Sequence, residues 1–93
     1  MKRLIMEYLL FTLPNCPKCD AMKAYLKETS LEVQEFDLVK KNGRVKIKDY
    51  LKVLNRDEKG SIIIPTMIIR DAAEVVSVLN TREELDSWLR SRA

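Results

Sequence analysis

An apolar run near the N-terminus, residues 4–13, constrains the fold more than any other feature of this sequence. Its only charged residue is Glu7, and it is rich in residues that favour strands, such as Ile5, Tyr8 and Phe11. A continuous apolar run of this length predicts a strand that is buried on both faces, in the centre of a sheet. Pro14 and Asn15 follow and should end the strand.

Both cysteines of the chain come directly after this strand, and Pro17 and Lys18 separate Cys16 from Cys19. Proline suits the first position of a helix, because its missing N–H costs nothing there. We therefore expect a helix over residues 17–28, with Cys16 at its N-terminus. Free N–H groups of the first turn favour a thiolate, so the pKa of Cys16 should fall below its ordinary value of about 8.5. Cys19 lies one turn further on and should face the interior.

Three kinds of site can use two cysteines at this spacing: half of a metal site, a static disulfide or a redox pair. A zinc site usually needs four ligands, and the chain has two cysteines and no histidine, so we predict no metal. A static disulfide is unusual in the cytosol, which is the compartment expected below. An inert pair is also possible, but a pair that opens a helix after a strand favours redox chemistry.

The rest of the chain predicts alternating strands and helices. Residues 32–39 should form a second strand, parallel to the first because a helix joins them. Gly43 should break the chain before a second helix, which ends before Gly60. An apolar run follows and is interrupted by Pro65, which fits a loop that leads into a strand. Whether the Ile64–Pro65 bond is cis is not decided by the local sequence.

A hairpin and a closing helix complete the predicted order, β-α-β-α-β-β-α. The second strand of the hairpin should cover residues 74–79, although its turn lacks the expected glycine. Thr81 and Glu84 form a capping box at the start of the last helix. The apolar positions of these elements should make one core: Ile5, Leu9, Phe11, Met22, Leu26, Phe36, Leu51, Leu54, Ile68, Val76, Val78, Leu85, Trp88 and Leu89.

Composition limits the remaining possibilities. The 93 residues are enough for one domain, 1–93, and the net charge of +3 is mild. The basic run over residues 40–48 is expected to be a solvated loop and helix start, not a nucleic-acid site, because no aromatic platform accompanies it. No stretch reaches the ~20 apolar residues of a membrane span, and Glu7 interrupts the one segment that resembles an export signal. We therefore predict a cytoplasmic protein.

The cysteine pair, the second βα unit and the later "IIPTMII" together resemble the thioredoxin superfamily over nearly the whole chain. Within it, "CPKC" is most similar to the glutaredoxin pattern "CPYC", because proline is the first residue between the cysteines. The resemblance implies an α/β thioredoxin-like fold with a four-stranded mixed sheet flanked by helices. It also implies that Pro65 follows a cis bond against the cysteines, and that Ile64 offers its backbone to a substrate.

The activity implied by this resemblance is thiol–disulfide exchange. Cys16 would attack a disulfide of a protein substrate and Cys19 would resolve the mixed disulfide, while Pro17, Lys18, Ile64 and Pro65 would contact the substrate. The alternative is a redox-sensing or adaptor module that binds a partner without turnover. The expected roles are electron transport and cell redox homeostasis, performed by a monomer.

The source of electrons depends on positions where the chain differs from the glutaredoxin pattern. Leu13 stands where glutaredoxins commonly carry a lysine that holds glutathione, and "LNTREEL" replaces their Gly-Gly segment. Lys18 replaces the usual tyrosine. The resemblance implies glutathione as a ligand, whereas these differences argue against it. We therefore expect no organic cofactor, and a flavoprotein of the thioredoxin-reductase type as the electron donor.

Overall fold

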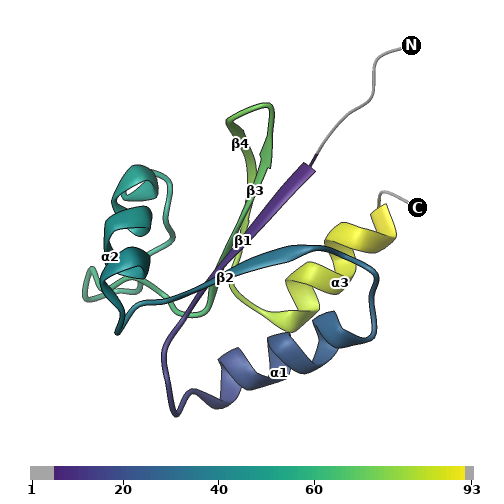
Figure 1. Cartoon of the computed structure of the whole chain (residues 1–93), viewed down its shortest axis with the longest axis horizontal. Helices are drawn as coiled ribbons and strands as arrows, with labels where there is room; N and C mark the ends of the chain where they lie inside the picture. The colour runs from purple at the N-terminus through teal and green to yellow at the C-terminus, as the bar shows by residue number, and fades with distance from the viewer. Residues whose placement is uncertain (1–5, 92–93) are drawn as a thin grey trace.

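The elements of the fold follow the predicted order (Figure 1). The computed structural model describes residues 6–91, so the predicted start of the first strand and Ile5 lie outside the described residues. The elements are β1 (Met6–Thr12), α1 (Pro17–Lys27), β2 (Val33–Asp37), α2 (Lys41–Ile47), a 3-10 helix η1 (Lys48–Tyr50), β3 (Thr66–Asp71), β4 (Glu74–Leu79) and α3 (Arg82–Ser91). Among these described residues, no helix has the length and apolar character needed to cross a membrane.

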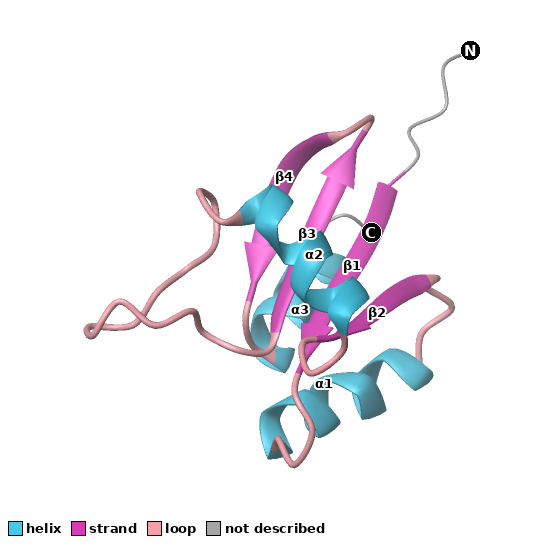
Figure 2. Cartoon of the chain, turned by 60° about the vertical axis from the view of Figure 1, so that its left-hand side comes forward, coloured by secondary structure: helices cyan, strands magenta, loops and turns pink. Residues whose placement is uncertain are grey.

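The four strands form one mixed sheet in the order β2-β1-β3-β4. β1 pairs in parallel with β2 and antiparallel with β3, and β3 and β4 form the antiparallel hairpin. The predicted fold class and the central position of the first strand are therefore confirmed. α1 and α3 cover one face of the sheet and α2 the other (Figures 1 and 2).

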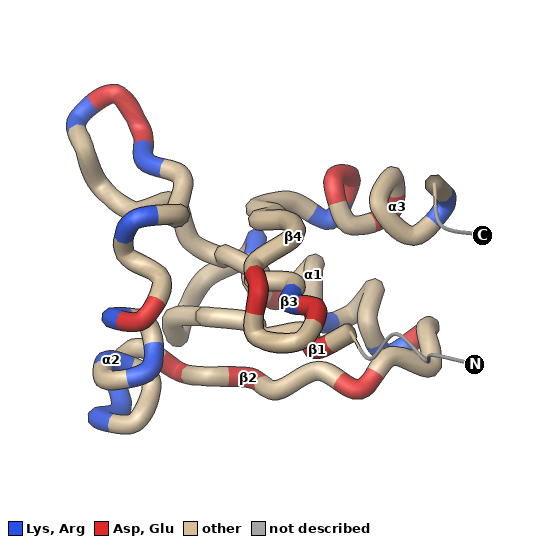
Figure 3. The backbone as a smooth tube through the Cα atoms, turned by 90° about the horizontal axis from the view of Figure 1, so that it is seen from above, with Lys and Arg blue, Asp and Glu red and all other residues tan. Residues whose placement is uncertain are grey.

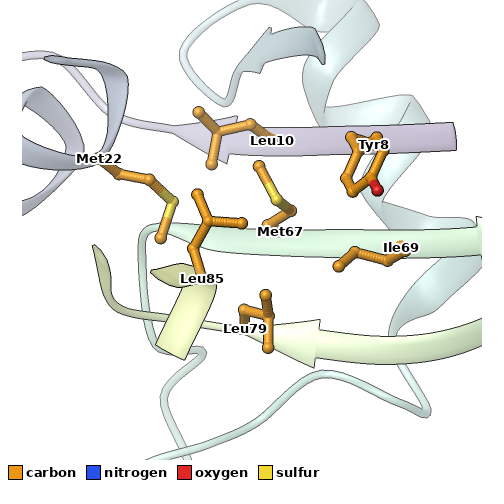
Figure 4. Close-up of a cluster of buried hydrophobic side chains, with 7 residues drawn as sticks. All are labelled: Tyr8, Leu10, Met22, Met67, Ile69, Leu79 and Leu85. Atoms are coloured by element: carbon orange, nitrogen blue, oxygen red, sulfur yellow. The ribbon is translucent and has the colours of Figure 1, made fainter. Parts of the chain in front are cut away.

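The core is divided between the two faces of the sheet, because neighbouring residues of a strand point to opposite sides. One cluster packs beneath α1 and α3 and consists of Tyr8, Leu10, Met22, Met67, Ile69, Leu79 and Leu85 (Figure 4). The other packs beneath α2 and η1 and consists of Leu9, Phe11, Ile47, Tyr50, Leu54 and Ile68. Alternate residues of β1 thus serve both clusters, which explains its continuous apolar sequence.

The second helix differs from the prediction. α2 begins at Lys41, contains Gly43 and ends at Ile47, where the 3-10 helix η1 takes over. Gly43 does not break the chain: it is buried where a Cβ atom would meet the carbonyl oxygen of Asp37. The glycine therefore lets the helix approach the end of β2 closely, which is a packing requirement that a propensity scale does not show.

Two residues predicted for the core are exposed. Leu51, 40% exposed, follows η1, whose tighter turn shifts the buried face away from α-helical spacing. Val76, 44% exposed, lies where the register between β3 and β4 shifts, since Arg70 pairs with Val75. An irregularity of this kind breaks the alternation of a strand, and it turns Val76 outward while Val75 and Val78 pack on the second cluster.

The other predicted core residues within 6–91 are buried or pack against a core cluster. The hairpin turn is made by Ala72 and Ala73, both with positive φ, instead of the glycine that such a turn favours. The capping box is confirmed: the backbone N–H of Glu84 donates to Oγ1 of Thr81 at 3.0 Å, and that of Thr81 donates to Oε1 of Glu84 at 3.2 Å.

Candidate functional site

Cys16 is the N-cap residue of α1. Its backbone is extended, with φ −120° and ψ 102°, and Pro17 takes the first helical position as predicted. The backbone N–H of Cys19 donates to Sγ of Cys16 at 3.1 Å, in the way that a serine or aspartate oxygen caps a helix. The helix therefore directs a hydrogen bond and the positive end of its dipole at this sulfur, and both stabilise a negative charge on it.

The two sulfurs of the pair differ in exposure. Cys16 is half-buried at the surface, whereas Cys19 is completely buried in the first turn of α1. They are joined as a disulfide across a Cα–Cα distance of 5.2 Å. A thiol or disulfide in solution can therefore reach Cys16 but not Cys19. Cys19 lies close enough to bond to Cys16 from the inner side.

The predicted docking residues Ile64 and Pro65 lie in the segment that leads into β3. The peptide bond between them is cis, and Pro65 is buried while Ile64 is half-buried. The long connection from η1 to this segment projects from the body of the molecule (Figure 2). Ile63 is held to the start of this connection, because its N–H donates to the carbonyl oxygen of Asn55 at 3.1 Å.

Asn80 is a site residue that the sequence analysis did not identify. Its side-chain nitrogen donates to the carbonyl oxygens of Ile63 at 3.1 Å and Pro65 at 3.0 Å, on either side of Ile64. Its side-chain oxygen accepts a hydrogen bond from Asn55 at 2.6 Å. One buried amide therefore fixes the segment that carries Pro65. The sequence offered one signal, the Asn-Thr pair that stands where a glycine pair was expected.

A pocket of about 230 Å³ lies between α1 and the start of α3, beside Lys18, which separates the two cysteines in the sequence. Lys18 and Ala21 of α1 form one wall, and Asn80 with the start of α3 forms the other. The pocket holds two cations, Lys18 and Arg82, and one acid, Glu83. Asn80 links this pocket to the segment before β3, because the same side chain donates to the carbonyl oxygen of Pro65.

A polar network holds α1 against α3 beside this pocket. The hydroxyl of Tyr25 donates to one carboxylate oxygen of Asp86 at 2.8 Å, and Arg90 pairs with the other at 2.8 Å. The hydrogen bonds from Arg90 and then Tyr25 lower the pKa of Asp86. The same bond to Asp86 raises the pKa of Tyr25, whose ring lies 5.8 Å from the Arg82 guanidinium.

The donor groups for a metal are scattered. Within residues 6–91, no three Cys, Asp or Glu side chains gather in a way that could hold a metal ion.

Comparison with known families decides the assignment. The family model of glutaredoxin matches residues 8–73, which include both cysteines and Pro65. The chain belongs to the glutaredoxin family. No curated protein matches the sequence.

Solved structures agree with the fold of this glutaredoxin. The thioredoxin-like protein BC3987 is 26% identical, with a TM-score of 0.58 over 87% of this chain and 97% of that one. Glutaredoxin 1 from Francisella tularensis is 18% identical, with a TM-score of 0.58 over 94% and 95% of the two chains. A thioredoxin from Thermus thermophilus is 20% identical, with a TM-score of 0.59 over 92% and 72%.

The glutaredoxin family model does not match the C-terminal part of the chain. It stops at residue 73, before Asn80 and the start of α3. In this glutaredoxin, the sulfur chemistry thus lies inside the matched region, whereas one wall of the pocket beside it lies outside. Family membership and the CxxC pair support thiol–disulfide chemistry of the oxidoreductase kind.

Proposed function

We propose that this protein is a dithiol oxidoreductase that reduces protein disulfides. The observation that carries the proposal is the asymmetry of the pair: Cys16 is half-exposed at the N-cap of α1, and Cys19 is buried behind it. An accessible sulfur stabilised as thiolate suits attack on a substrate. A buried partner within bonding distance suits intramolecular release of that substrate.

The reaction takes place in two exchanges. The Cys16 thiolate attacks one sulfur of the substrate disulfide, the substrate S–S bond breaks, and the departing substrate thiolate takes a proton. Cys19 then loses its proton and attacks Cys16 Sγ, so the mixed disulfide breaks and the second substrate thiol leaves. Two electrons have passed to the substrate, and the protein is left with the Cys16–Cys19 disulfide, the form observed.

The substrate would lie along the segment before β3. Ile64 is half-buried, and the carbonyls on both sides of it are held by Asn80, so its own backbone is presented in a fixed position. An extended chain can pair with backbone groups held in this way. Pro17 and Lys18, both exposed beside Cys16, would contact the other side of the substrate.

A reductant must return the disulfide to two thiols. We assign this role to a flavoprotein of the thioredoxin-reductase type, with the protein acting as a monomer in the cytoplasm. The capping box supports this choice over glutathione, because Glu84 accepts from the N–H groups of Asn80 and Thr81. Those backbone donors are then not free to bind a glutathione carboxylate.

A reduction assay tests the proposal with single-thiol variants as mutual controls. Reduction of insulin by dithiothreitol should be accelerated by the native protein and by neither variant. Cys19→Ser should accumulate mixed disulfides with its substrates, whereas Cys16→Ser should form none. A native disulfide that opens and closes without accelerating insulin reduction would instead identify a redox-sensing or adaptor module. Substantial turnover by Cys16→Ser would contradict the mechanism.

A further inference from the structure

The charge of this protein is concentrated in one segment. Residues 40–52 contain six lysines and arginines and a single acid, Asp49. The rest of the chain contains eleven basic and thirteen acidic residues, so the net positive charge comes entirely from this segment. In the structure the segment forms α2, η1 and the turn that follows, and Figure 3 shows its cations gathered at one side of the molecule.

These cations are exposed and are not neutralised by neighbouring acids. Lys41, Arg44, Lys48 and Lys52 are all exposed and recur at spacings of three or four residues. Within residues 6–91, the ion pairs involve only Lys23, Arg70 and Arg90 as cations, so none lies in this segment. We call residues 40–52 the basic face. The charge of its cations is therefore available to a partner.

The cations at the start of the basic face do not serve the stability of α2. Cations stabilise a helix at its C-terminus and destabilise it at its N-terminus. α2 nevertheless has Lys40 as its N-cap without a side-chain capping bond, Lys41 as its first residue and no acid in its first turn. Like charges three and four residues apart also repel each other. Arg44 has a use within the fold, since it lies in the last turn and donates to the carbonyl oxygen of Leu38, whereas the cations at the start of the helix cost stability.

The same face also exposes apolar side chains. Val45 is 54% exposed and Leu51 40%, and at the two edges of the face Val39 is 56% and Val53 42% exposed. Cations mixed with small apolar groups and without an exposed aromatic ring fit an acidic protein surface better than a nucleic acid. The buried side of the segment is already used by Ile47, Tyr50 and Leu54 in the core.

The basic face begins at the end of the sheet that carries the cysteines. Thr12 and Asp37 pair at the last positions of β1 and β2, and the N–H of Leu38 donates to the carbonyl of Thr12 at 2.9 Å. Cys16 lies four residues after Thr12, the end of β1, and Lys41 lies four residues after Asp37, the end of β2. Cys16 and the basic face therefore both leave the sheet at the end where β1 and β2 finish, so a partner that reaches past Cys16 along this edge would meet the start of the basic face.

We propose that the basic face docks an acidic segment of the protein whose disulfide reacts with Cys16. This inference rests on the proposed function and adds the chemical class of the partner. Attraction between opposite charges raises the rate of encounter and orients the partner, and its effect decreases with salt. Disulfides in acidic surroundings should therefore be reduced faster than the same disulfides in neutral surroundings.

Binding can be tested apart from redox chemistry. A peptide rich in Asp and Glu and lacking cysteine is titrated into the oxidised protein and followed by amide chemical shifts. Saturable shifts in residues 39–53 are expected, with no comparable shifts from the matched Asn and Gln peptide. Lys48→Glu and the double variant Lys41→Glu with Lys48→Glu should weaken binding, the double variant by about tenfold. Lys27→Glu, an equal charge change at an exposed lysine of α1, should leave binding unchanged.

Reduction of disulfide peptides separates this inference from the proposed function. With acidic flanks, kcat/KM should exceed that for neutral flanks at low salt. Lys48→Glu should reduce the difference, and the double variant should reduce it further, without changing the rate for the neutral substrate. Equal rates for both substrates, or equal loss in Lys27→Glu, would overturn the docking inference while leaving the oxidoreductase intact. No reduction of either substrate, with acidic-peptide binding preserved, would overturn the function alone. Tighter binding to anionic vesicles or to duplex DNA than to the acidic peptide would overturn the choice of a protein partner.

Discussion

At the scale of single residues, the site depends on one buried amide as much as on its sulfurs. The side chain of Asn80 is buried, with 7% of the residue exposed. Its nitrogen donates to two carbonyl oxygens, and its oxygen accepts a hydrogen bond from the amide nitrogen of Asn55. A side chain with both a donor and an acceptor is required to satisfy all three. A residue that can only donate or only accept hydrogen bonds cannot replace it.

Asn80→Asp should therefore destabilise the protein, since an acceptor oxygen would face the carbonyls of Ile63 and Pro65. The loss should be about 1–3 kcal/mol or more, because buried groups lose their partner and a charge is introduced. Urea unfolding measures it. Asn42→Asp, the same change at an exposed position of α2, should stay within about 0.5 kcal/mol of the native protein. Equal stability of the two variants would contradict the role given to Asn80.

The sequence identified the sulfur residues but not this amide, for a physical reason. Cys16, Pro17 and Cys19 act within one turn of helix, so their spacing alone carries the information. Asn80 acts on Ile63 and Pro65, fifteen or more residues away in the chain. Side-chain bonds of this range depend on how β4 is placed beside β3, and local pattern does not contain that placement.

At the scale of elements, the close approach of α2 to β2 depends on Gly43. A Cβ atom there would lie 2.2 Å from the carbonyl oxygen of Asp37, and backbone cannot move aside as a flexible side chain can. Gly43→Ala should destabilise by about 1–3 kcal/mol, even though alanine is the better helix former. Asn42→Ala, at the exposed neighbouring position, should instead be neutral or slightly stabilising. Thermal unfolding of both variants tests this, and a stabilised Gly43→Ala protein would refute it.

The packing of α1 on α3 should depend on pH. The pKa of Asp86 is lowered below its ordinary value of 3.8 by bonds from Arg90 and Tyr25. A group with a lowered pKa in the folded state stabilises the fold above its ordinary value, and the contribution is lost as the pH falls through the folded value. Asp86→Asn should thus be less stable than the native protein at neutral pH, with the difference shrinking below about pH 4.

Urea unfolding of both proteins at neutral pH and at about pH 3 measures this change. Tyr25→Phe removes one of the two donors, so it should remove only part of the pH dependence. A difference between native protein and Asp86→Asn that stays constant over this range would show that the pKa of Asp86 is not lowered in solution.

The sequence predicted a helix or strand correctly where the spacing of its apolar residues stays the same over the whole element. β1 and α1 are long and regular, so run length and helical spacing were sufficient. The second helix was misjudged because it changes from α to 3-10 geometry at Lys48, and the two geometries bury different residues. Val76 was misjudged because the register shift in β4 interrupts strand alternation. In both cases tertiary packing sets a local geometry that no single period describes.

At the scale of the whole molecule, we expect the residues around the pocket to decide which donor can reduce the disulfide. Glutathione at neutral pH carries two carboxylates and one amine, and each must exchange water for a partner on the protein. Lys18 and Arg82 offer cations at the pocket, but Glu83 opposes them, and Glu84 already accepts from the N–H groups of Asn80 and Thr81. Leu13, 40% exposed before the cysteines, supplies no charge.

We therefore expect a thioredoxin-type flavoprotein reductase to reduce the Cys16–Cys19 disulfide faster than glutathione does. Two coupled assays run side by side, one with glutathione and glutathione reductase and one with a thioredoxin reductase, measure both rates by NADPH consumption. Glu84→Gln should change the glutathione rate little, because a glutamine oxygen still accepts from the same N–H groups. Glu84→Ala frees those groups and should raise the glutathione rate. Efficient turnover with glutathione by the native protein would refute the assignment of the donor and leave the chemistry of the two cysteines unchanged.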